Sequence, residues 1–322
     1  MSATSSHGPA VRGLGTPCGT AAIERLLGPL GEGCRPSASR FPDGAQMRIE
    51  IPSVEGPEAL AAVLDEAAAR GVTVHRVSQG SGAMLLTRAE LSEMARMGAD
   101  AGLEVNLFVG PREEFGVGSA VRSPEGGQFA GRLRGLDQLR YAVEDIYRAV
   151  EAGIRGFLIA DLGLMEVLAS LVAKEELPSG IVWKISAVLA PSNPVTFRQL
   201  VDAGGTTINV PTDMTLDQLC ELRSVSDAPI DLYVEAPDAL GGVVRGHELT
   251  EIALAAAPLY AKFGLRNARA VYPAGIQVQA DVVANVREKV RRSQLALEWL
   301  DRSGVEISRS APSAPGIGVP CP

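Results

Sequence analysis

The chain repeats one pattern eight times: a short run rich in β-forming residues, then a segment rich in Ala, Leu, Glu and Arg. The β-rich runs lie at 47–53, 72–78, 103–109, 156–162, 182–188, 206–212, 230–236 and 259–265. The helical segments lie at 57–70, 87–101, 136–152, 164–176, 194–203, 215–225, 247–257 and 278–302. Regular alternation of strands and helices is typical of a parallel sheet with right-handed crossovers. Eight such units in about 260 residues predict a (β/α)8 TIM barrel.

The alternative fold is a doubly wound open sheet, whose central strands are apolar along nearly their whole length. Most of the runs here instead carry a polar residue near their C-terminal end, as at Lys184 and Asn209, which favours the barrel. Residues 1–44 and 303–322 are rich in Gly, Pro and Ser and are predicted to be loose extensions. The barrel domain is therefore expected to span residues 45–302.

Charged residues interrupt the run at 230–236. Asp231, Tyr233 and Glu235 alternate with aliphatic residues, so all three share one face of a strand. The same phase in the other runs places polar side chains inside the barrel near the strand ends, where TIM-barrel enzymes carry their active sites. The predicted inward set consists of Arg48, Glu50, His75 or Arg76, Asn106, Asp161, Lys184, Ser186, Asn209, Tyr233, Glu235 and Lys262.

Two lysines are notable because the chain has four lysines among its 30 basic residues. Lys184 and Lys262 both belong to the inward set. A desolvated lysine can lose its proton, and beside a second cation it can act as a nucleophilic amine that forms a Schiff base with a carbonyl. A buried carboxylate can act as a general acid or base. The predicted catalytic residues are Lys184, Lys262, Glu235, Asp161 and Glu50.

Two other interpretations of the inward set stay open. The three carboxylates, with Asn106 and Asn209 as further oxygen ligands, could hold a divalent metal ion such as Mg²⁺ or Mn²⁺. Alternatively, the carboxylates could neutralise Arg48, Lys184 and Lys262 in a salt-bridge network that fills a non-catalytic binding barrel. No residue is assigned as a metal ligand, and the cofactor is left unknown.

Loops after the strands indicate how a substrate is held. The segment Gly110 to Gly135 is long, rich in glycine and contains four arginines, which is typical of a lid that closes on an anion, or of a subunit contact. The turn SQGSG at 78–82 offers backbone N–H groups to a phosphate or carboxylate. A small anionic substrate is predicted, bound by Arg48, His75, Arg76, Asn106, Arg112, Asn209, Tyr233, Arg266 and Asn267.

Composition argues against several classes of partner. The net charge of −8 and the lack of a basic run argue against nucleic-acid binding, and no apolar run reaches the ~18 residues of a membrane span. The four cysteines are scattered without a CxxC pair, so neither a zinc site nor an iron–sulfur cluster is expected. A cytoplasmic protein with reduced thiols is predicted, with Cys220 in the core. Homo-oligomers are common among barrels, so such an assembly stays open.

The stretch RYAVEDIYRAVEAGIRGFLIADLG at 140–163 resembles the collagenase-like peptidase family of unknown catalytic type, in which a helix with AGI also leads to a strand ending in DLG. The segment KISAVLAPSNPVTFRQLVDAGGTTINVP is similar to the same family's barrel. The resemblance covers residues 45–300 and implies a TIM-barrel-like fold and a peptidase or hydrolase activity, with Asp161 and Gly163 at matching positions. Some members carry a four-cysteine iron–sulfur cluster, which the cysteines here do not reproduce. No HExxH motif or nucleophile dyad accompanies the resemblance.

Overall fold

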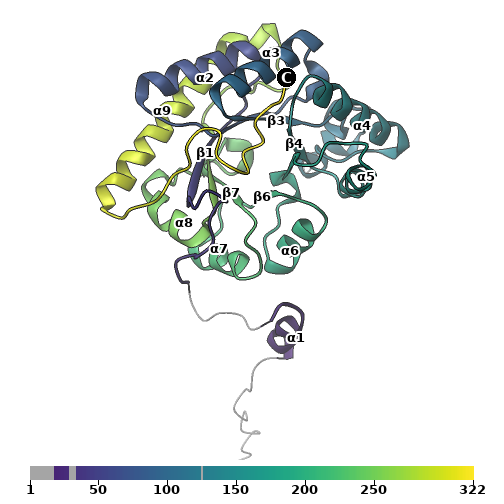
Figure 1. Ribbon diagram of the computed structural model, residues 1–322. Coiled ribbons are helices and arrows are strands. Elements are labelled where there is room, and N and C mark those ends of the chain that lie inside the picture. Colours follow the sequence, from purple (N-terminus) through teal and green to yellow (C-terminus); the bar gives the residue numbers. More distant parts are fainter. Residues whose placement is uncertain (1–17, 29–33, 125) are drawn as a thin grey trace, which may run out of the picture. The chain divides into compact units, whose positions relative to one another are not determined.

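The computed structural model describes residues 18–28, 34–124 and 126–322 (Figure 1). The chain divides into two units, Met1–Glu32 and Gly33–Pro322. The described part of the first unit is the helix α1 (Cys18–Leu27). Much of the predicted N-terminal extension therefore lies outside the described residues.

The second unit is a closed barrel of eight parallel strands, each hydrogen-bonded to the next in sequence and β8 to β1. The predicted (β/α)8 TIM barrel is confirmed. The strands are β1 (Met47–Pro52), β2 (Arg76–Gln79), β3 (Glu104–Phe108), β4 (Gly156–Ile159), β5 (Val182–Ile185), β6 (Thr207–Asn209), β7 (Ile230–Glu235) and β8 (Leu259–Phe263). They are mostly shorter than the sequence runs, because several runs include the first residues of the following loop.

Helices surround the barrel (Figure 1). They are α2 (Pro57–Arg70), α3 (Arg88–Ala101), α4 (Gly135–Glu151), α5 (Leu162–Ala173), α6 (Pro194–Asp202), α7 (Leu216–Arg223), α8 (Leu249–Ala256) and α9 (Gln279–Ser303). Capping boxes begin α3, at Thr87 and Glu90, and α7, at Thr215 and Gln218. Gly102 ends α3 in the left-handed conformation with φ 63°, which glycine adopts without steric cost.

The apolar core lies between the strands and the helices. Alternate strand residues such as Ile49, Ile51 and Leu232 point outward into it and are essentially inaccessible to solvent. The intervening residues point into the barrel, and many of them are charged. The fold therefore has an apolar shell around a polar interior.

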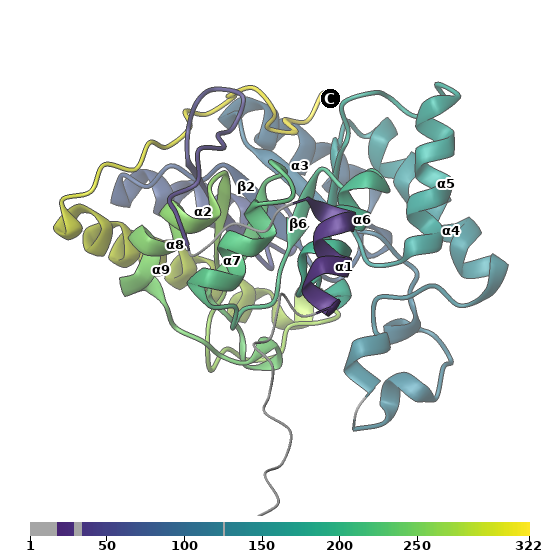
Figure 2. The same ribbon diagram turned by 90° about the horizontal axis from the view of Figure 1, so that it is seen from below.

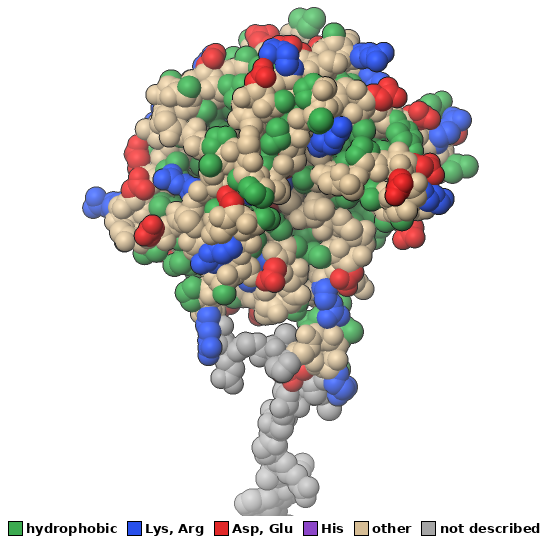
Figure 3. All heavy atoms as spheres, viewed as in Figure 1, with side chains coloured by type: hydrophobic (Ala, Val, Ile, Leu, Met, Phe, Trp, Pro, Cys, Tyr) green, Lys and Arg blue, Asp and Glu red, His purple; other side chains and the backbone are tan. Residues whose placement is uncertain are grey.

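The C-terminal segment Gly304–Pro322 crosses the N-terminal end of the barrel (Figures 1 and 2). Arg309 pairs with Met47 as a parallel β-bridge, and the Ser313 amide donates to the Gly102 carbonyl at 2.8 Å, just before β3. The predicted C-terminal extension is present, but it is not loose, because its backbone groups bond to the turns that precede the strands. Figure 3, in the same orientation, shows acidic and basic side chains interspersed on this face.

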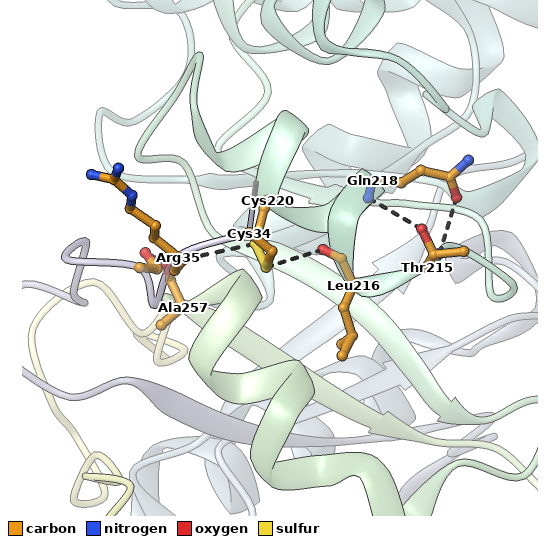
Figure 4. Close-up of a disulfide and its surroundings, with 8 residues drawn as sticks. Cys34, Arg35, Thr215, Leu216, Gln218, Cys220 and Ala257 are labelled. Atoms are coloured by element: carbon orange, nitrogen blue, oxygen red, sulfur yellow. Dashed lines mark hydrogen bonds between the residues drawn. A yellow bond between two sulfur atoms is a disulfide. The ribbon is translucent and has the colours of Figure 1, made fainter. Parts of the chain in front are cut away.

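Residues 34–44 of the predicted N-terminal extension also pack on the barrel. The Ser37 hydroxyl donates to the Ala257 carbonyl at 2.5 Å. Cys34 is joined to Cys220 of α7 by a disulfide, with the two Cα atoms 5.3 Å apart (Figure 4). The prediction of reduced thiols is therefore wrong for this pair, and Cys220 is partly buried against the apolar core. Because the two cysteines lie 186 residues apart in the sequence, composition alone could not predict that they form a disulfide.

None of the described helices is long and apolar enough to cross a membrane.

Candidate functional site

Glu50 lies at the centre of a group of charged side chains inside the barrel. It is fully buried on β1 and accepts a hydrogen bond from the Ser78 hydroxyl at 2.6 Å. Its carboxylate forms an ion pair with Lys184 of β5 and lies 3.3 Å from Arg76 Nη1 of β2. Its Oε1 is 3.5 Å from Lys262 Nζ of β8. One carboxylate thus joins three cations that come from different strands.

Two further carboxylates complete this group. Asp231 Oδ2 lies 3.1 Å from Lys184 Nζ and 3.2 Å from Arg76 Nη1, and it accepts a hydrogen bond from the Thr207 hydroxyl at 2.9 Å. Glu104 Oε1 is 2.8 Å from Arg76 Nε. With Glu50, Asp231 and Glu104 facing Arg76, Lys184 and Lys262, three negative charges meet three positive ones. We call these six residues the interior charge cluster.

Arg76 lies beside Tyr260 and Glu104, and Asn106 contacts the cluster through Glu104. The Arg76 guanidinium lies 3.5 Å from the centre of the Tyr260 ring, and Asn106 Nδ2 donates to Glu104 Oε1 at 3.0 Å. Within the described residues, Arg76 Nη2 and Asn106 Oδ1 have no hydrogen-bond partner. Both of these predicted substrate ligands are fully buried inside the barrel.

Lys262 is the one member of the interior charge cluster that has any exposed surface. Its Nζ donates to Asn209 Oδ1 at 2.5 Å and lies 4.1 Å from the centre of the Tyr233 ring. Tyr233 is partly exposed and Lys262 is 3% exposed, whereas Glu50 and Lys184 have no exposed surface. The carboxylate that Lys262 contacts is shared with two other cations. Lys262 is therefore the cation most available to a molecule at the barrel mouth.

Burial and charge set the protonation of the central pair. Burial by itself would raise the pKa of Glu50, but attraction to Lys184, Lys262 and Arg76 outweighs it and holds that pKa well below its usual value. Burial lowers the pKa of Lys184 to about 8, against the attraction of Asp231 and Glu50. At neutral pH both groups are ionised. Lys184 nevertheless loses its proton more readily than an ordinary lysine does.

Acid is expected to destabilise the protein through Glu50. The unfolded chain takes up a proton near the ordinary pKa of 4.5, whereas folded Glu50 stays ionised to lower pH. The contribution of Glu50 to the free energy of unfolding is therefore fully present above about pH 4.5. It is lost as the pH falls below that value, by about 1.4 kcal/mol per pH unit. Asp145, whose pKa burial raises to about 6, acts in the opposite direction above its unfolded pKa of 3.8.

Urea unfolding at a series of pH values would measure this slope. The contribution of Glu50 is the difference in slope between the natural chain and Glu50→Gln, because all other groups are common to both. Equal slopes would show that Glu50 is not the group responsible.

Glu235, a predicted catalytic residue, does not join the cluster. The register of β7 against β8 shifts between Tyr233 and Glu235, which is a β-bulge. A bulge inserts one residue and so reverses the faces of those that follow. Glu235 Oε1 accepts a hydrogen bond from the Arg266 amide at 3.3 Å, and Oε2 lies 3.8 Å from Arg292 Nε of α9. The prediction that Glu235 shares the face of Tyr233 is wrong.

Asp161 also leaves the predicted ring. β4 ends at Ile159, so Asp161 is the N-cap of α5 and accepts a hydrogen bond from the Leu164 amide at 3.0 Å. Its second oxygen accepts from the Leu133 amide at 3.0 Å. Both carboxylate oxygens of Asp161 therefore accept hydrogen bonds from backbone amides. Through them Asp161 connects the start of α5 to the long loop before α4.

Arg48 and His75 lie at the opposite end of the barrel from the mouth. Arg48 donates to the Ser310 hydroxyl and the Pro315 carbonyl, each at 2.8 Å. His75 Nδ1 accepts from the Ile49 amide at 2.9 Å, so its Nε2 carries the proton and donates to the Ser310 carbonyl at 2.8 Å. Burial lowers the pKa of His75 to about 4. The C-terminal segment covers both residues, so the structure does not bring them to the barrel mouth with Lys262.

Arg112 attaches the long loop, residues 110–135, to the turn that follows β2. Arg112 donates to the carbonyls of Ser81 at 3.1 Å and Gly80 at 2.7 Å, and its guanidinium lies 3.9 Å from the centre of the Phe108 ring. The Gly80 and Ser81 amides in turn donate to Glu55 at 2.6 and 3.1 Å. The predicted anion-binding roles of Arg112 and of the SQGSG turn are therefore not supported, because these donors already hold protein groups.

Arg266 and Asn267 lie in the loop after β8. Arg266 Nε is 3.5 Å from Asp238 Oδ1, and the Asn267 amide donates to Asp238 Oδ2 at 2.6 Å. The Arg266 side chain is 57% exposed, so it stays available to a ligand near the mouth.

The predicted metal-binding carboxylates do not meet. Glu50 is central, whereas Glu235 and Asp161 lie elsewhere. Among the residues that the structure describes, no three His, Cys, Asp or Glu side chains are grouped to hold a metal ion. The set proposed from the sequence is therefore not a metal centre.

Sequence reasoning chose Glu50, Lys184 and Lys262 but not Asp231 or Glu104 as site residues. Asp231 lies on the same strand face as Tyr233, and Glu104 lies two residues before Asn106 on β3. The period-two pattern that places Tyr233 and Asn106 inside the barrel also places Asp231 and Glu104 there. These two carboxylates, which neutralise the cations of the cluster, could therefore be found from the same pattern.

No family model matches the chain, and no curated protein matches it. Solved structures that resemble it include the U32 peptidase Mk0906, with 19% identity, 60% of this chain and 70% of that chain covered, and a TM-score of 0.40. The putative copper homeostasis protein CutC from Streptococcus agalactiae has 15% identity, coverages of 67% and 98%, and a TM-score of 0.45. A putative lyase/mutase from Burkholderia cenocepacia has 16% identity, coverages of 89% and 88%, and a TM-score of 0.41. These values are too low to carry an argument about activity, and membership of the peptidase family stays a prediction.

Proposed function

We propose that the protein is an enzyme that binds a small substrate with a carboxylate or phosphate group at the C-terminal end of the barrel, with Lys262 as the contact for that group. The observation that carries the proposal is the position of Lys262. It borders the partly exposed Tyr233, and the carboxylate 3.5 Å away also neutralises Lys184 and Arg76. A ligand anion would give Lys262 a second contact beside the Glu50 carboxylate, which it shares with Lys184 and Arg76.

Lys184 and Glu50 supply the proton-transfer chemistry in this proposal. Glu50 lies 3.5 Å from Lys262 and forms an ion pair with Lys184, and the pKa of Lys184, lowered by burial to about 8, is close to neutral pH. Acid–base catalysis is most efficient when the pKa of the catalytic group lies near the working pH. Arg76 and Asp231 hold the pair in place and do not meet the substrate.

Replacing Lys262 tests the binding role. We expect Lys262→Met to weaken binding of a small carboxylate or phosphate compound, found by thermal-shift screening of the natural chain, by about 10- to 100-fold. Calorimetric titration of the purified variants measures this change. Lys262→Arg keeps the positive charge and should retain most of the affinity. Lys174→Met, which removes an exposed lysine at the end of α5, is the matched control. Unchanged binding by Lys262→Met would refute the proposed contact.

A Schiff-base lyase is the second candidate, favoured by the nearness of Lys262 and Lys184 around one carboxylate. Borohydride reduction in the presence of carbonyl-containing ligands, followed by peptide mass spectrometry, separates the two. A covalent adduct on Lys262 that is absent from Lys262→Arg supports the lyase. Binding without an adduct supports a non-covalent contact between Lys262 and the ligand.

A further inference from the structure

Tyr272, in the loop that follows β8, reaches across to the ends of β1 and β2. Its hydroxyl donates to Ser53 Oγ at 2.6 Å, and the Ala274 amide in the same loop donates to Ser81 Oγ at 2.8 Å. Ser53 follows the last residue of β1, and Ser81 lies in the turn after β2. The loop therefore crosses part of the C-terminal end of the barrel, where the proposed ligand binds.

A glycine just after β2 makes room for the Tyr272 ring. A Cβ atom added to Gly80 would lie 2.4 Å from the Tyr272 hydroxyl oxygen, which is too close for two atoms that are not bonded. Gly80 is two residues after Ser78, whose hydroxyl donates to Glu50 at 2.6 Å inside the barrel. Because residues two apart in a strand point to the same side, Tyr272 occupies a place one step nearer the barrel mouth than Ser78.

The acceptor of this hydrogen bond has an unusual backbone. Ser53 has φ 60°, a left-handed conformation that serine adopts much less readily than glycine. A glycine there would have no hydroxyl to hold Tyr272. The backbone at the end of β1 therefore carries a serine at a position that favours glycine, and the serine hydroxyl fixes the tyrosine.

Lys262, the proposed ligand contact, is nearly covered. It is 3% exposed, whereas Tyr272 is 45% exposed. Lys262 Nζ lies 3.5 Å from the same Glu50 oxygen that accepts the hydrogen bond from Ser78. Side chains at the mouth must therefore move before a ligand from solvent can contact Lys262.

We propose that Tyr272 is the residue that controls access to Lys262. Bonded to Ser53 it closes the β1–β2 side of the mouth, and rotated away it admits a ligand, so it limits the size of the molecule that enters. The inference rests on the proposed function in taking Lys262 as the ligand contact.

The lysines of the chain make this access measurable. Labelling with trinitrobenzenesulfonate, followed by peptide mass spectrometry, gives a separate rate for each lysine. Tyr272→Phe, which removes the bond to Ser53, should raise the labelling rate of Lys262 by about three- to tenfold. The rate at the exposed Lys174 should not change, and Lys184, which has no exposed surface, should stay unlabelled.

Gly80→Ala gives an independent test, because its added methyl group would push the Tyr272 ring out of place without changing the tyrosine. It should also accelerate labelling of Lys262. Tyr141→Phe, at an exposed tyrosine on α4, is the matched control and should have no effect. An unchanged Lys262 rate in Tyr272→Phe and Gly80→Ala would overturn the proposal. An equal rise at Lys184 would also overturn it, because the whole barrel would then have loosened.

The labelling experiment and the calorimetric test of Lys262→Met can fail separately. Calorimetry asks whether Lys262 holds a ligand, whereas labelling asks whether Tyr272 controls the path to Lys262. Faster labelling without any ligand binding would leave the access role standing and refute the proposed function.

Discussion

Replacing Glu50 by Gln is expected to lower the free energy of unfolding by about 3–5 kcal/mol, the usual cost of removing one partner from a buried ion pair. Glu50 has no exposed surface and contacts Lys184, Arg76 and Lys262. The variant would leave one positive charge without a counterion in the barrel interior. Urea denaturation at neutral pH measures the loss through the shift in midpoint at constant slope.

A second substitution distinguishes charge balance from packing. Glu50→Gln combined with Lys184→Met removes one charge of each sign, so the double variant should lose less stability than the sum of the two single variants. Glu93→Gln, in an exposed pair with Arg96 on α3, is the control and should leave the unfolding midpoint nearly unchanged. Strict additivity of the two interior substitutions would contradict a coupled cluster.

Deleting residues 309–322 is expected to destabilise the barrel by several kcal/mol. The deletion removes the Ser310 and Pro315 partners of Arg48, and the Ser310 partner of His75. Each buried polar group left without a partner costs about 1–3 kcal/mol. Since a domain of this kind has a total stability of about 5–15 kcal/mol, the truncated chain should unfold at much lower urea concentration or accumulate as insoluble protein.

Nested truncations make this result specific. Removing Cys321 and Pro322 costs one backbone hydrogen bond, from the Cys321 amide to the Gly153 carbonyl, and should have a small effect. A chain ending at Gly316 keeps Ser310 and Pro315 and should be intermediate. If the chain lacking 309–322 is as stable as the one lacking the last two residues, the segment does not close the barrel end.

Closure of the N-terminal end also bears on function. Arg48 and His75 have the chemistry of ligand-binding residues, but the C-terminal segment holds both. Their hydrogen bonds to Ser310 and Pro315 hold the C-terminal segment against the N-terminal end of the barrel. In the proposed function the substrate therefore approaches from the other end, where Tyr233 is partly exposed and Lys262 is 3% exposed.

Period-two reasoning succeeded where a strand is regular. Glu50, Lys184 and Lys262 were predicted to face one another, and in the structure the two lysines share the Glu50 carboxylate. It failed at strand ends. Asp161 follows the last residue of β4 and caps a helix, and Glu235 follows a bulge. A strand's length and a bulge depend on hydrogen bonds to neighbouring strands, which a single run of sequence does not contain.

By itself the sequence determined the barrel and the identity of its central charges, because alternation of strands and helices and alternation of strand faces are local properties. The tertiary structure alone decided which charges neutralise one another, which end of the barrel is covered, and that Glu235 lies outside the interior charge cluster. These depend on contacts between residues far apart in the chain, such as Arg48 with Ser310 and Glu235 with Arg292. Such contacts form only when the strands close into a barrel, so the local sequence around each residue does not predict them.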